Sequence, residues 1–399
     1  MKKICIVGND FKYKKLLQAY HFIFNYKTQR NFEFQIKEFL KVNNCYLTSC
    51  GTAGLYVILK SIKEKIPDKT EIIIPAYTPS VMILPAKKLN LKIKLCDISL
   101  TNFLIDISKI GNLITENTLA IIPVHLFGIP VDISKIYRIL KDKINKEISI
   151  IEDFAQGFGS ELNNIKLGGF SEIGFSSFGR GKNFSLYGGG LLVLNSDKYK
   201  KTIEKNLNAL LDKSKISQIK DIIKFIFFSI LIQPNIYFFL SNCISPFKSK
   251  KEQTSFSISK MGSICKKFGC YLFELWLQDY NVRIQNGMYL YNYLKNMDKL
   301  IVPEYPENAK IAFSRFPVIV KDIKLKYKLY YELKKNNIES SFMYNKPVHQ
   351  IYDLGYKLNE FPNANYLAEH LLTLPVHGNI NKKDLDKTIS VLYDTSKKY

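Results

Sequence analysis

The chain has 399 residues, 46% of them hydrophobic, which is enough for one large or two medium domains with a sizeable core. Lys and Arg outnumber Asp and Glu by 58 to 35, and the formal net charge of +23 suits anionic partners such as membranes or phosphorylated substrates. No basic run is interleaved with aromatic residues as in nucleic-acid modules, so we expect no nucleic-acid partner.

The cysteine pattern and the N-terminus both favour a reducing compartment. The seven cysteines are odd in number and have the spacing of neither a zinc site nor a disulfide framework. The first apolar stretch, Ile4–Val7, is too short for a signal peptide. We therefore expect a cytoplasmic protein without a metal site.

Residues 1–44 predict a short strand and one or two helices with polar faces. After them, small residues lead into a segment with helical periodicity from Leu55 to Ile62. Backbone N–H groups at the start of such a helix, near Gly51, can bind a phosphate together with the Thr52 hydroxyl. An ordinary Ser/Thr helix cap is the alternative interpretation.

Strands and helices alternate over the next hundred residues. This alternation predicts a mostly parallel sheet with helices on both faces. The expected strands are Glu71–Pro75, Leu91–Cys96, Leu119–Val124 and Ile148–Ile151, with helices ending near Leu89 and covering Ile133–Leu140.

Polar residues follow these strands, where ligands collect in parallel sheets. Thr78, His125, Asp153, Gln156 and Lys182 all fall at such positions. Asp153 is either a helix cap or a buried carboxylate that pairs with a cationic ring nitrogen. His125 is either a structural histidine or a ring that stacks on, or hydrogen-bonds to, a planar cofactor.

The stretch 175–194 predicts two strands joined by a glycine-rich loop that carries Lys182. Glycines allow the backbone to approach a ligand closely. A lysine held in such a pocket loses hydration and its pKa falls, as the nucleophilic lysine of a covalent cofactor site requires. The alternative is a surface hairpin with a solvated lysine.

The most apolar part of the chain is Ile222–Leu240, after a lysine-rich helical stretch at 195–220. Its length approaches that of a membrane span, but Lys224 and the break at Pro234 argue against one. We expect two short helices in a membrane interface, flanked by the basic run 248–251. A buried helical hairpin or a dimer contact is the equally weighted alternative.

The remaining residues predict a helical stretch at 255–297 and a second, smaller α/β unit at 298–399. In this unit Ala312–Val320 and Leu371–Leu374 read as strands, Lys324–Lys335 reads as a helix, and a last helix closes the chain.

Seven short motifs, in their order and spacing, resemble the sugar aminotransferases of the DegT/DnrJ/EryC1/StrS family from about residue 45 to 395. The resemblance implies the fold type I architecture of enzymes that use pyridoxal 5′-phosphate (PLP). It divides the chain into a large PLP-binding domain (1–215), a hydrophobic insertion (216–254), and a connecting helix with a small C-terminal domain (255–399). The motifs are Cys50–Leu55, Pro75–Thr78, Val124–Pro130, Ile151–Gln156, Ser177–Lys182, Gly188–Gly190 and Leu374–His377.

The resemblance also implies roles for individual residues. Lys182 would bind PLP covalently and later move a proton, and Asp153 would pair with the pyridinium nitrogen so that the ring acts as an electron sink. Gln156 would face the ring near its phenolic oxygen. The phosphate would be held by Gly51, Thr52 and Ser177.

Two positions depart from the family pattern. Pro79 stands where an aromatic residue usually stacks on the PLP ring, which leaves Tyr77 or His125 as candidates for ring contact. The turn Tyr187–Gly190 replaces the usual Gly-Glu-Gly-Gly. Relatives that remove the sugar 3-hydroxyl have histidine in place of the lysine, so Lys182 favours transamination.

The function implied is transfer of an amino group from glutamate to a keto-sugar, linked to a nucleotide or to a lipid, in surface-glycan or amino-sugar synthesis. The family resemblance further implies a homodimer, and the hydrophobic insertion suggests peripheral contact with the inner face of the cell membrane. The alternatives are a PLP-dependent sugar dehydratase or epimerase, and a non-catalytic membrane-associated scaffold. Lys182, Asp153 and Gln156 argue against the scaffold.

Overall fold

The computed structural model describes residues 2–8, 31–142, 147–244 and 254–399. Its largest sheet has seven strands in the order β1-β9-β8-β5-β4-β2-β3. From β8 to β3 all neighbours are parallel, whereas β9 runs antiparallel to β8 and β1, so the predicted mostly parallel sheet is confirmed. The strands are β1 (Asn44–Thr48), β2 (Glu71–Pro75), β3 (Lys92–Cys96), β4 (Thr118–Ile121), β5 (Ser149–Asp153), β8 (Ile173–Ser177) and β9 (Gly190–Leu194).

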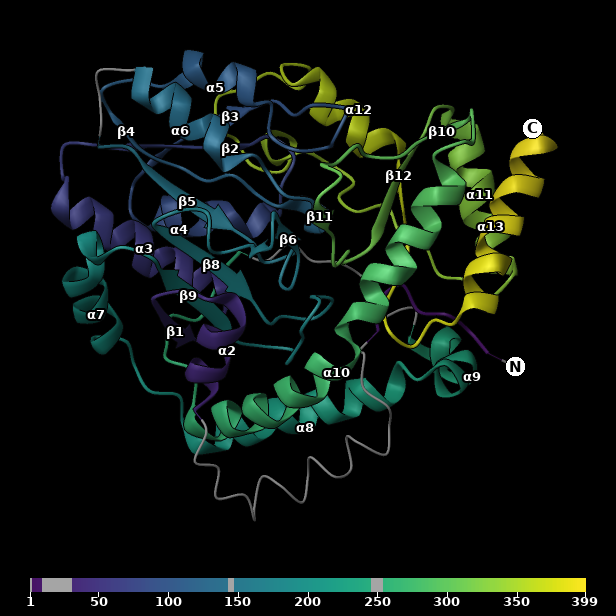
Figure 1. Cartoon of the computed structure of the whole chain (residues 1–399), viewed down its shortest axis with the longest axis horizontal. Coiled ribbons are helices and arrows are strands. Elements are labelled where there is room, and N and C mark those ends of the chain that lie inside the picture. The colour runs from purple at the N-terminus through teal and green to yellow at the C-terminus, as the bar shows by residue number, and fades with distance from the viewer. Residues whose placement is uncertain (1, 9–30, 143–146, 245–253) are drawn as a thin grey trace.

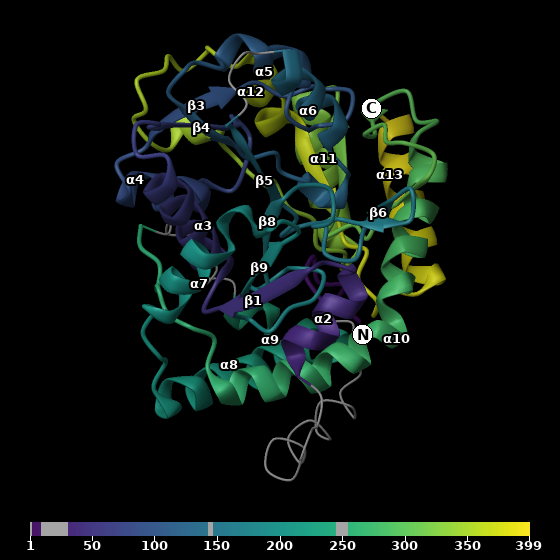
Figure 2. The same cartoon turned by 60° about the vertical axis from the view of Figure 1, so that its left-hand side comes forward.

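Helices lie on both sides of this sheet (Figures 1 and 2). Strands covered on both faces are buried along their whole length, and β2, β5 and β9 are buried at every residue. The helices are α2 (Phe32–Leu40), α3 (Gly51–Lys65), α4 (Ile83–Lys88), α5 (Ile107–Leu113), α6 (Ile133–Asp142) and α7 (Lys200–Asn208).

The N-terminal region differs in part from expectation. The predicted strand Ile4–Val7 is reduced to a single bridge between Ile4 and Ile338. One predicted helix is α2, whose first turn is capped by Asn31, and any other helix predicted within 9–30 lies outside the described residues. Strand β1 was not predicted, because its five residues are polar at both ends and show no clear alternation.

The second α/β unit forms a three-stranded sheet in the order β10-β12-β13. The predicted strand Ala312–Val320 is shorter than expected, because residues 311–315 form a loop that reaches the large sheet's ligand edge. The helical stretch predicted at 255–297 begins only at Ser263, because the preceding residues are extended and Ser259 and Lys260 form isolated bridges. The other two predicted helices are confirmed, and α12 was not predicted. The elements are α10 (Ser263–Leu294), β10 (Leu300–Ile301), β12 (Phe316–Val320), α11 (Ile323–Lys335), α12 (Pro362–His370), β13 (Leu371–Leu374) and α13 (Lys382–Lys397).

A third, small sheet ties the two units together. Strand β6 (Glu161–Leu162) pairs with β7 (Ile165–Lys166) on one side and with β11 (Ala309–Lys310) on the other. Because β11 lies shortly before residues 311–315, this pairing fixes that loop against the large sheet.

The hydrophobic segment forms α8 (Lys215–Leu231) and α9 (Pro234–Ile244), so the predicted break at Pro234 is confirmed. Proline suits this position because the first residue of a helix needs no backbone N–H. Among the described residues, no helix combines the length and apolar character needed to cross a membrane. The basic run 248–251 lies outside the described residues.

Candidate active site

Polar residues follow the ends of two neighbouring strands of the large sheet. β5 ends at Asp153 and continues to Gln156, while β8 ends at Ser177 and continues to Lys182. The strands are parallel, with Asp153 opposite Phe175, so both segments emerge at the same edge. There they border a pocket of about 280 Å³ lined by Pro79, Ser80, Val81, Gln156, Arg180, Gly181, Lys182, Ser314, Arg315, Met343 and Tyr344.

The loop that carries Lys182 is held from three sides. Gly181 adopts a φ of +82°, which glycine tolerates, immediately before the lysine. The Asn183 side chain donates to the carbonyl oxygens of Phe158 (3.1 Å) and Ala312, and the Trp276 indole on α10 donates to the Asn183 carbonyl (3.0 Å). Lys182 is therefore positioned by both units of the molecule.

The electrostatics of the pocket favour a reactive amine. Burial lowers the pKa of Lys182, the nearby Arg315 acts in the same direction, and the Asp153 carboxylate opposes both. Burial raises the pKa of Asp153, against the opposing effects of Lys182, the Ala155 N–H and His125. A lysine with a lowered pKa has more of the neutral form that attacks a carbonyl carbon.

Asp153 has one carboxylate oxygen occupied and one available. Its Oδ1 accepts a hydrogen bond from the Ala155 N–H at 2.9 Å. Its Oδ2 accepts none from the described part of the chain, and the side chain is 3% exposed. No helix follows Asp153, so the helix-cap interpretation is wrong: the Ala155 contact belongs to a turn. The carboxylate is buried, as the other interpretation predicts.

The expected phosphate-binding residues lie together at the start of α3. Gly51 begins the helix, and a Cβ at this position would lie 2.8 Å from the Ser177 Cβ, so the helix start and the end of β8 are in close contact. Cys50 provides no side-chain cap, and the N–H groups of Gly51 and Thr52 donate to no backbone carbonyl of the described residues. An anion is the natural partner for such groups.

The glycine-rich turn after Lys182 has a packing role. A Cβ at Gly190 would lie only 2.2 Å from the Cys50 carbonyl carbon and 2.5 Å from the Gly51 nitrogen. The turn is further bonded to this region by the Gly189 N–H, which donates to the Ser49 carbonyl at 2.8 Å. The turn that departs from the family pattern thus supports the helix start.

Gln156 reaches the pocket as part of a hydrogen-bonded set. Its Oε1 accepts from the Phe127 N–H (3.1 Å) and the Ser314 hydroxyl (3.3 Å), which fixes the side-chain orientation. Its Nε2 donates to the Tyr344 hydroxyl at 3.1 Å. Since that hydroxyl oxygen accepts here, the phenolic proton has no described partner and is available to a ligand.

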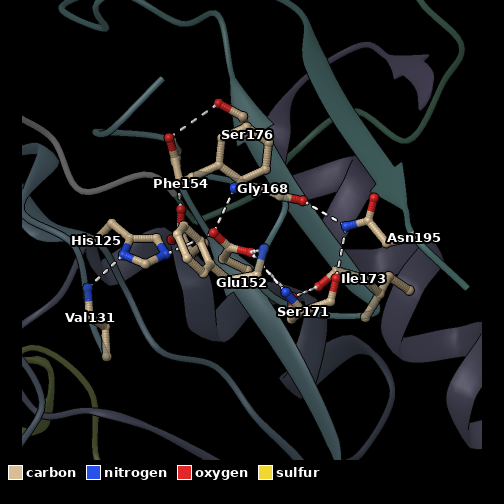
Figure 3. A network of polar contacts seen from close by, with 12 residues as sticks. His125, Val131, Glu152, Phe154, Gly168, Ser171, Ile173, Ser176 and Asn195 are labelled. Carbon is tan, nitrogen blue, oxygen red and sulfur yellow. Dashed lines mark hydrogen bonds and ion pairs between the residues drawn. The ribbon is translucent and has the colours of Figure 1, made fainter. Parts of the chain in front are cut away.

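His125 lies behind the strand ends and not on the pocket wall. Its side chain is fully buried, its Nε2 lies 3.0 Å from Glu152 Oε1, and its Nδ1 accepts from the Val131 N–H at 2.8 Å (Figure 3). Glu152 in turn accepts from backbone N–H groups that include those of Gly168 and Phe170. The structural interpretation of His125 accounts for all these contacts.

Tyr77 is likewise buried beside the pocket, while Pro79 lines it. The Tyr77 hydroxyl donates to the Tyr344 carbonyl at 3.0 Å and accepts from the Tyr344 N–H. These bonds position the segment that contains Met343 and Tyr344. Thr78, also buried, donates to the sulfur of Met82 at 3.0 Å.

Sequence reasoning missed the pocket residues supplied by the second unit: Ser314, Arg315, Met343 and Tyr344. Arg315 donates to the Ser341 hydroxyl at 2.7 Å, and burial lowers the pKa of its guanidinium. No carboxylate of the described residues forms an ion pair with Arg315. No local pattern marks these residues, because they reach the pocket only through the packing of distant segments.

These residues fit PLP by the chemistry of their donors. Uncapped N–H groups and a serine hydroxyl suit a phosphate, a buried carboxylate with a free oxygen suits a protonated ring nitrogen, and a lysine of lowered pKa suits the aldehyde. All three groups border the same edge of the sheet.

Solved structures of similar architecture support this fold assignment. Helicobacter pylori PseC, an aminotransferase involved in the biosynthesis of pseudoaminic acid, superposes with a TM-score of 0.78 at 19% identity, and 100% of both chains is covered. Escherichia coli GDP-4-keto-6-deoxy-D-mannose-3-dehydratase with bound hydrated PLP gives 0.74 at 19% identity, over 98% of this chain and all of that chain. The fold is type I of the PLP-dependent enzymes.

The sequence profile of the DegT/DnrJ/EryC1/StrS aminotransferase family matches residues 9–224 and 248–393, and the chain belongs to this family. The dTDP-4-amino-4,6-dideoxy-D-glucose transaminase of Shigella dysenteriae is 27% identical over 386 residues, which cover 94% of this chain and 92% of that protein. The class is therefore that of PLP-dependent sugar aminotransferases, and the cofactor is PLP.

Proposed function

We propose that this enzyme transfers an amino group from glutamate to a keto-sugar carried on a nucleotide diphosphate, with a lipid-linked keto-sugar as the alternative substrate. The observation that carries the proposal is the Lys182 amine, lowered in pKa beside Asp153, in a pocket lined by further cations. Its product would serve surface-glycan or amino-sugar synthesis.

Bound PLP supplies an electron sink for the negative charge that develops when a proton leaves the amino donor. In this proposal the Asp153 carboxylate holds the positive charge on the ring nitrogen. The Lys182 amine takes the proton from Cα of the donor and later returns one to the sugar side. The N–H groups of Gly51 and Thr52, with the Ser177 hydroxyl, hold the phosphate.

The charge of the pocket supports anionic substrates. Arg180, Lys182 and Arg315 line it, and no Asp or Glu does so among the described residues. Arginine forms paired hydrogen bonds with carboxylates and phosphates, so Arg315 is suited to a carboxylate of glutamate or to the sugar diphosphate. The Tyr344 hydroxyl adds a donor for a substrate oxygen.

Sugar dehydration is the second candidate, because a dehydratase is among the proteins of the same fold. The presence of Lys182 in place of the histidine of such relatives favours transamination, and the intact Lys182, Asp153 and Gln156 disfavour a non-catalytic scaffold. We further propose a cytoplasmic homodimer with peripheral contact at the inner face of the cell membrane.

The test is an assay with L-glutamate and a panel of nucleotide-linked keto-sugars. We expect 2-oxoglutarate and the amino-sugar in equal amounts, with no product in Lys182→Ala. Arg180→Gln serves as the control. Because this exposed side chain lies at the pocket rim, we expect a smaller loss of amine transfer than in Lys182→Ala. Loss of the sugar hydroxyl without 2-oxoglutarate formation would contradict transamination and establish the dehydratase.

A further inference from the structure

Helix α8 has two apolar faces, and only one of them is packed on the protein. Ile222 and Phe225 are buried, as are the polar side chains of Gln218 and Ser229 at positions that share this face. Phe225 contacts Phe268 of α10, with ring centroids 5.0 Å apart. This inner face accounts for how α8 is held on the molecule.

The outer stripe consists of Ile216, Ile219, Ile223 and Phe227. These side chains are 70%, 48%, 55% and 57% exposed, and their spacing of three and four residues places them on one face. Helix α8 runs along an outer edge of the molecule (Figures 1 and 2), and on the adjoining α9 Phe239 is 73% exposed. Such a run of exposed apolar residues indicates an interaction surface.

Lysines border the outer stripe on both sides. At 3.6 residues per turn, Lys220 and Lys224 flank one side of it and Lys215 the other. All three are exposed, and none forms an ion pair with a described residue. The acidic side chain of the same helix, Asp221, is already paired with Lys213.

We propose that the outer stripe of α8 lies in the interfacial region of an anionic membrane, with its lysines at the lipid phosphates. An apolar stripe flanked by basic residues is the pattern of helices that lie on a membrane surface. Each lysine near an anionic surface adds electrostatic attraction. In the sequence three further lysines, at 248, 250 and 251, follow α9.

A second copy of the chain fits this surface less well. Two identical outer stripes in contact would bring two sets of unpaired lysines together, and like charges across an interface oppose association. Anionic headgroups neutralise the same lysines. None of these residues lines the active-site pocket, so membrane binding is measurable apart from the proposed chemistry.

The experiment is co-sedimentation of the full chain with phosphatidylcholine vesicles, with and without phosphatidylglycerol. We expect binding to the anionic vesicles that weakens as salt rises. The stripe variant Ile223→Asp/Phe227→Asp and the border variant Lys220→Glu/Lys224→Glu should each bind at least about tenfold more weakly. The control variant Leu358→Asp, at a side chain 71% exposed on a distant loop, should bind as the wild type does.

Circular dichroism and amine transfer with soluble substrates establish that each variant is folded, so a loss of vesicle binding is assigned to the surface. Failure of the wild type to bind anionic vesicles would overturn the proposal. Unchanged binding by the stripe variant would also overturn it. A dimer that the stripe variant converts to a monomer, without vesicle binding by the wild type, would assign the stripe to a second copy instead.

Discussion

Lys182 and Asp153 adjust each other's charge state at the edge of the sheet that borders the pocket. Burial makes charge costly for both groups, and their mutual attraction recovers part of that cost. Arg315 acts only against the charged form of Lys182. The reactivity of the lysine therefore depends on two neighbours of opposite sign, one from each unit of the molecule.

This arrangement predicts opposite pH shifts in two variants. Capture of PLP by the cofactor-free enzyme requires the neutral amine, so its rate should rise with pH through a pKa below that of free lysine. Arg315→Gln removes a like charge and should raise this pKa, whereas Asp153→Asn removes the attracting carboxylate and should lower it. Stopped-flow absorbance across the pH range measures both shifts.

Lys220→Gln is the control for this experiment, because it removes one positive charge on the distant helix α8 and should leave the pKa unchanged. If the pKa shifted in the same direction in Arg315→Gln and Asp153→Asn, the opposite effects assigned to these two neighbours of Lys182 would be contradicted.

Several site residues were predictable from short stretches of sequence. Asp153, Gln156 and Lys182 each follow a strand, and parallel strands bring such residues to one edge. Arg315 and Tyr344 were not predictable in this way, since they depend on the pairing of β11 with β6 and on the bonds of Tyr77. His125, like Asp153, is a polar residue that follows a predicted strand. Its side chain nevertheless contacts Glu152 inside the protein and does not line the pocket.

At the scale of elements, β9 lies in close contact with the start of α3. We therefore predict that alanine substitutions at two nearby glycines change the free energy of unfolding by very different amounts. Gly190→Ala should lower the free energy of unfolding by about 1–3 kcal/mol, because its Cβ would overlap the Cys50 carbonyl carbon. Gly188→Ala should change it by less than about 0.5 kcal/mol, because no atom lies within 4 Å of the position that its Cβ would take.

Urea unfolding of the cofactor-free protein measures both glycine variants. Equal stabilities of Gly188→Ala and Gly190→Ala would show that the turn does not support the helix start. Their relative affinities for inorganic phosphate provide a second comparison, since a displaced α3 should bind the anion more weakly.

Strong apolar runs mark the elements that sequence reasoning found, such as β2, β9 and the helix pair broken at Pro234. The elements it missed are short or polar. Strand β1 has a polar face, and β6, β7 and β11 have two residues each, too few for a period to be recognised.

At the scale of the whole molecule, the active site lies between two units that are far apart in the sequence. The segments that follow strands of the large sheet supply Gln156 and Lys182 to the pocket, and the smaller unit supplies Arg315 and Tyr344. Helix α8 packs by one face and exposes the other. The composition indicated an affinity for anions. The fold shows that the positive charge lies at two distinct places, the active-site pocket and the lysine-bordered apolar surface of α8.

The central claim is that Lys182 binds PLP and that glutamate donates the amine. The most direct test is the absorbance spectrum of the purified protein with PLP, before and after L-glutamate, for the wild type and Lys182→Ala. We predict a near-visible band from PLP bound through Lys182, its conversion by glutamate to the shorter-wavelength band of the aminated cofactor, and loss of the first band in the variant. A wild-type spectrum identical to that of free PLP would contradict the claim.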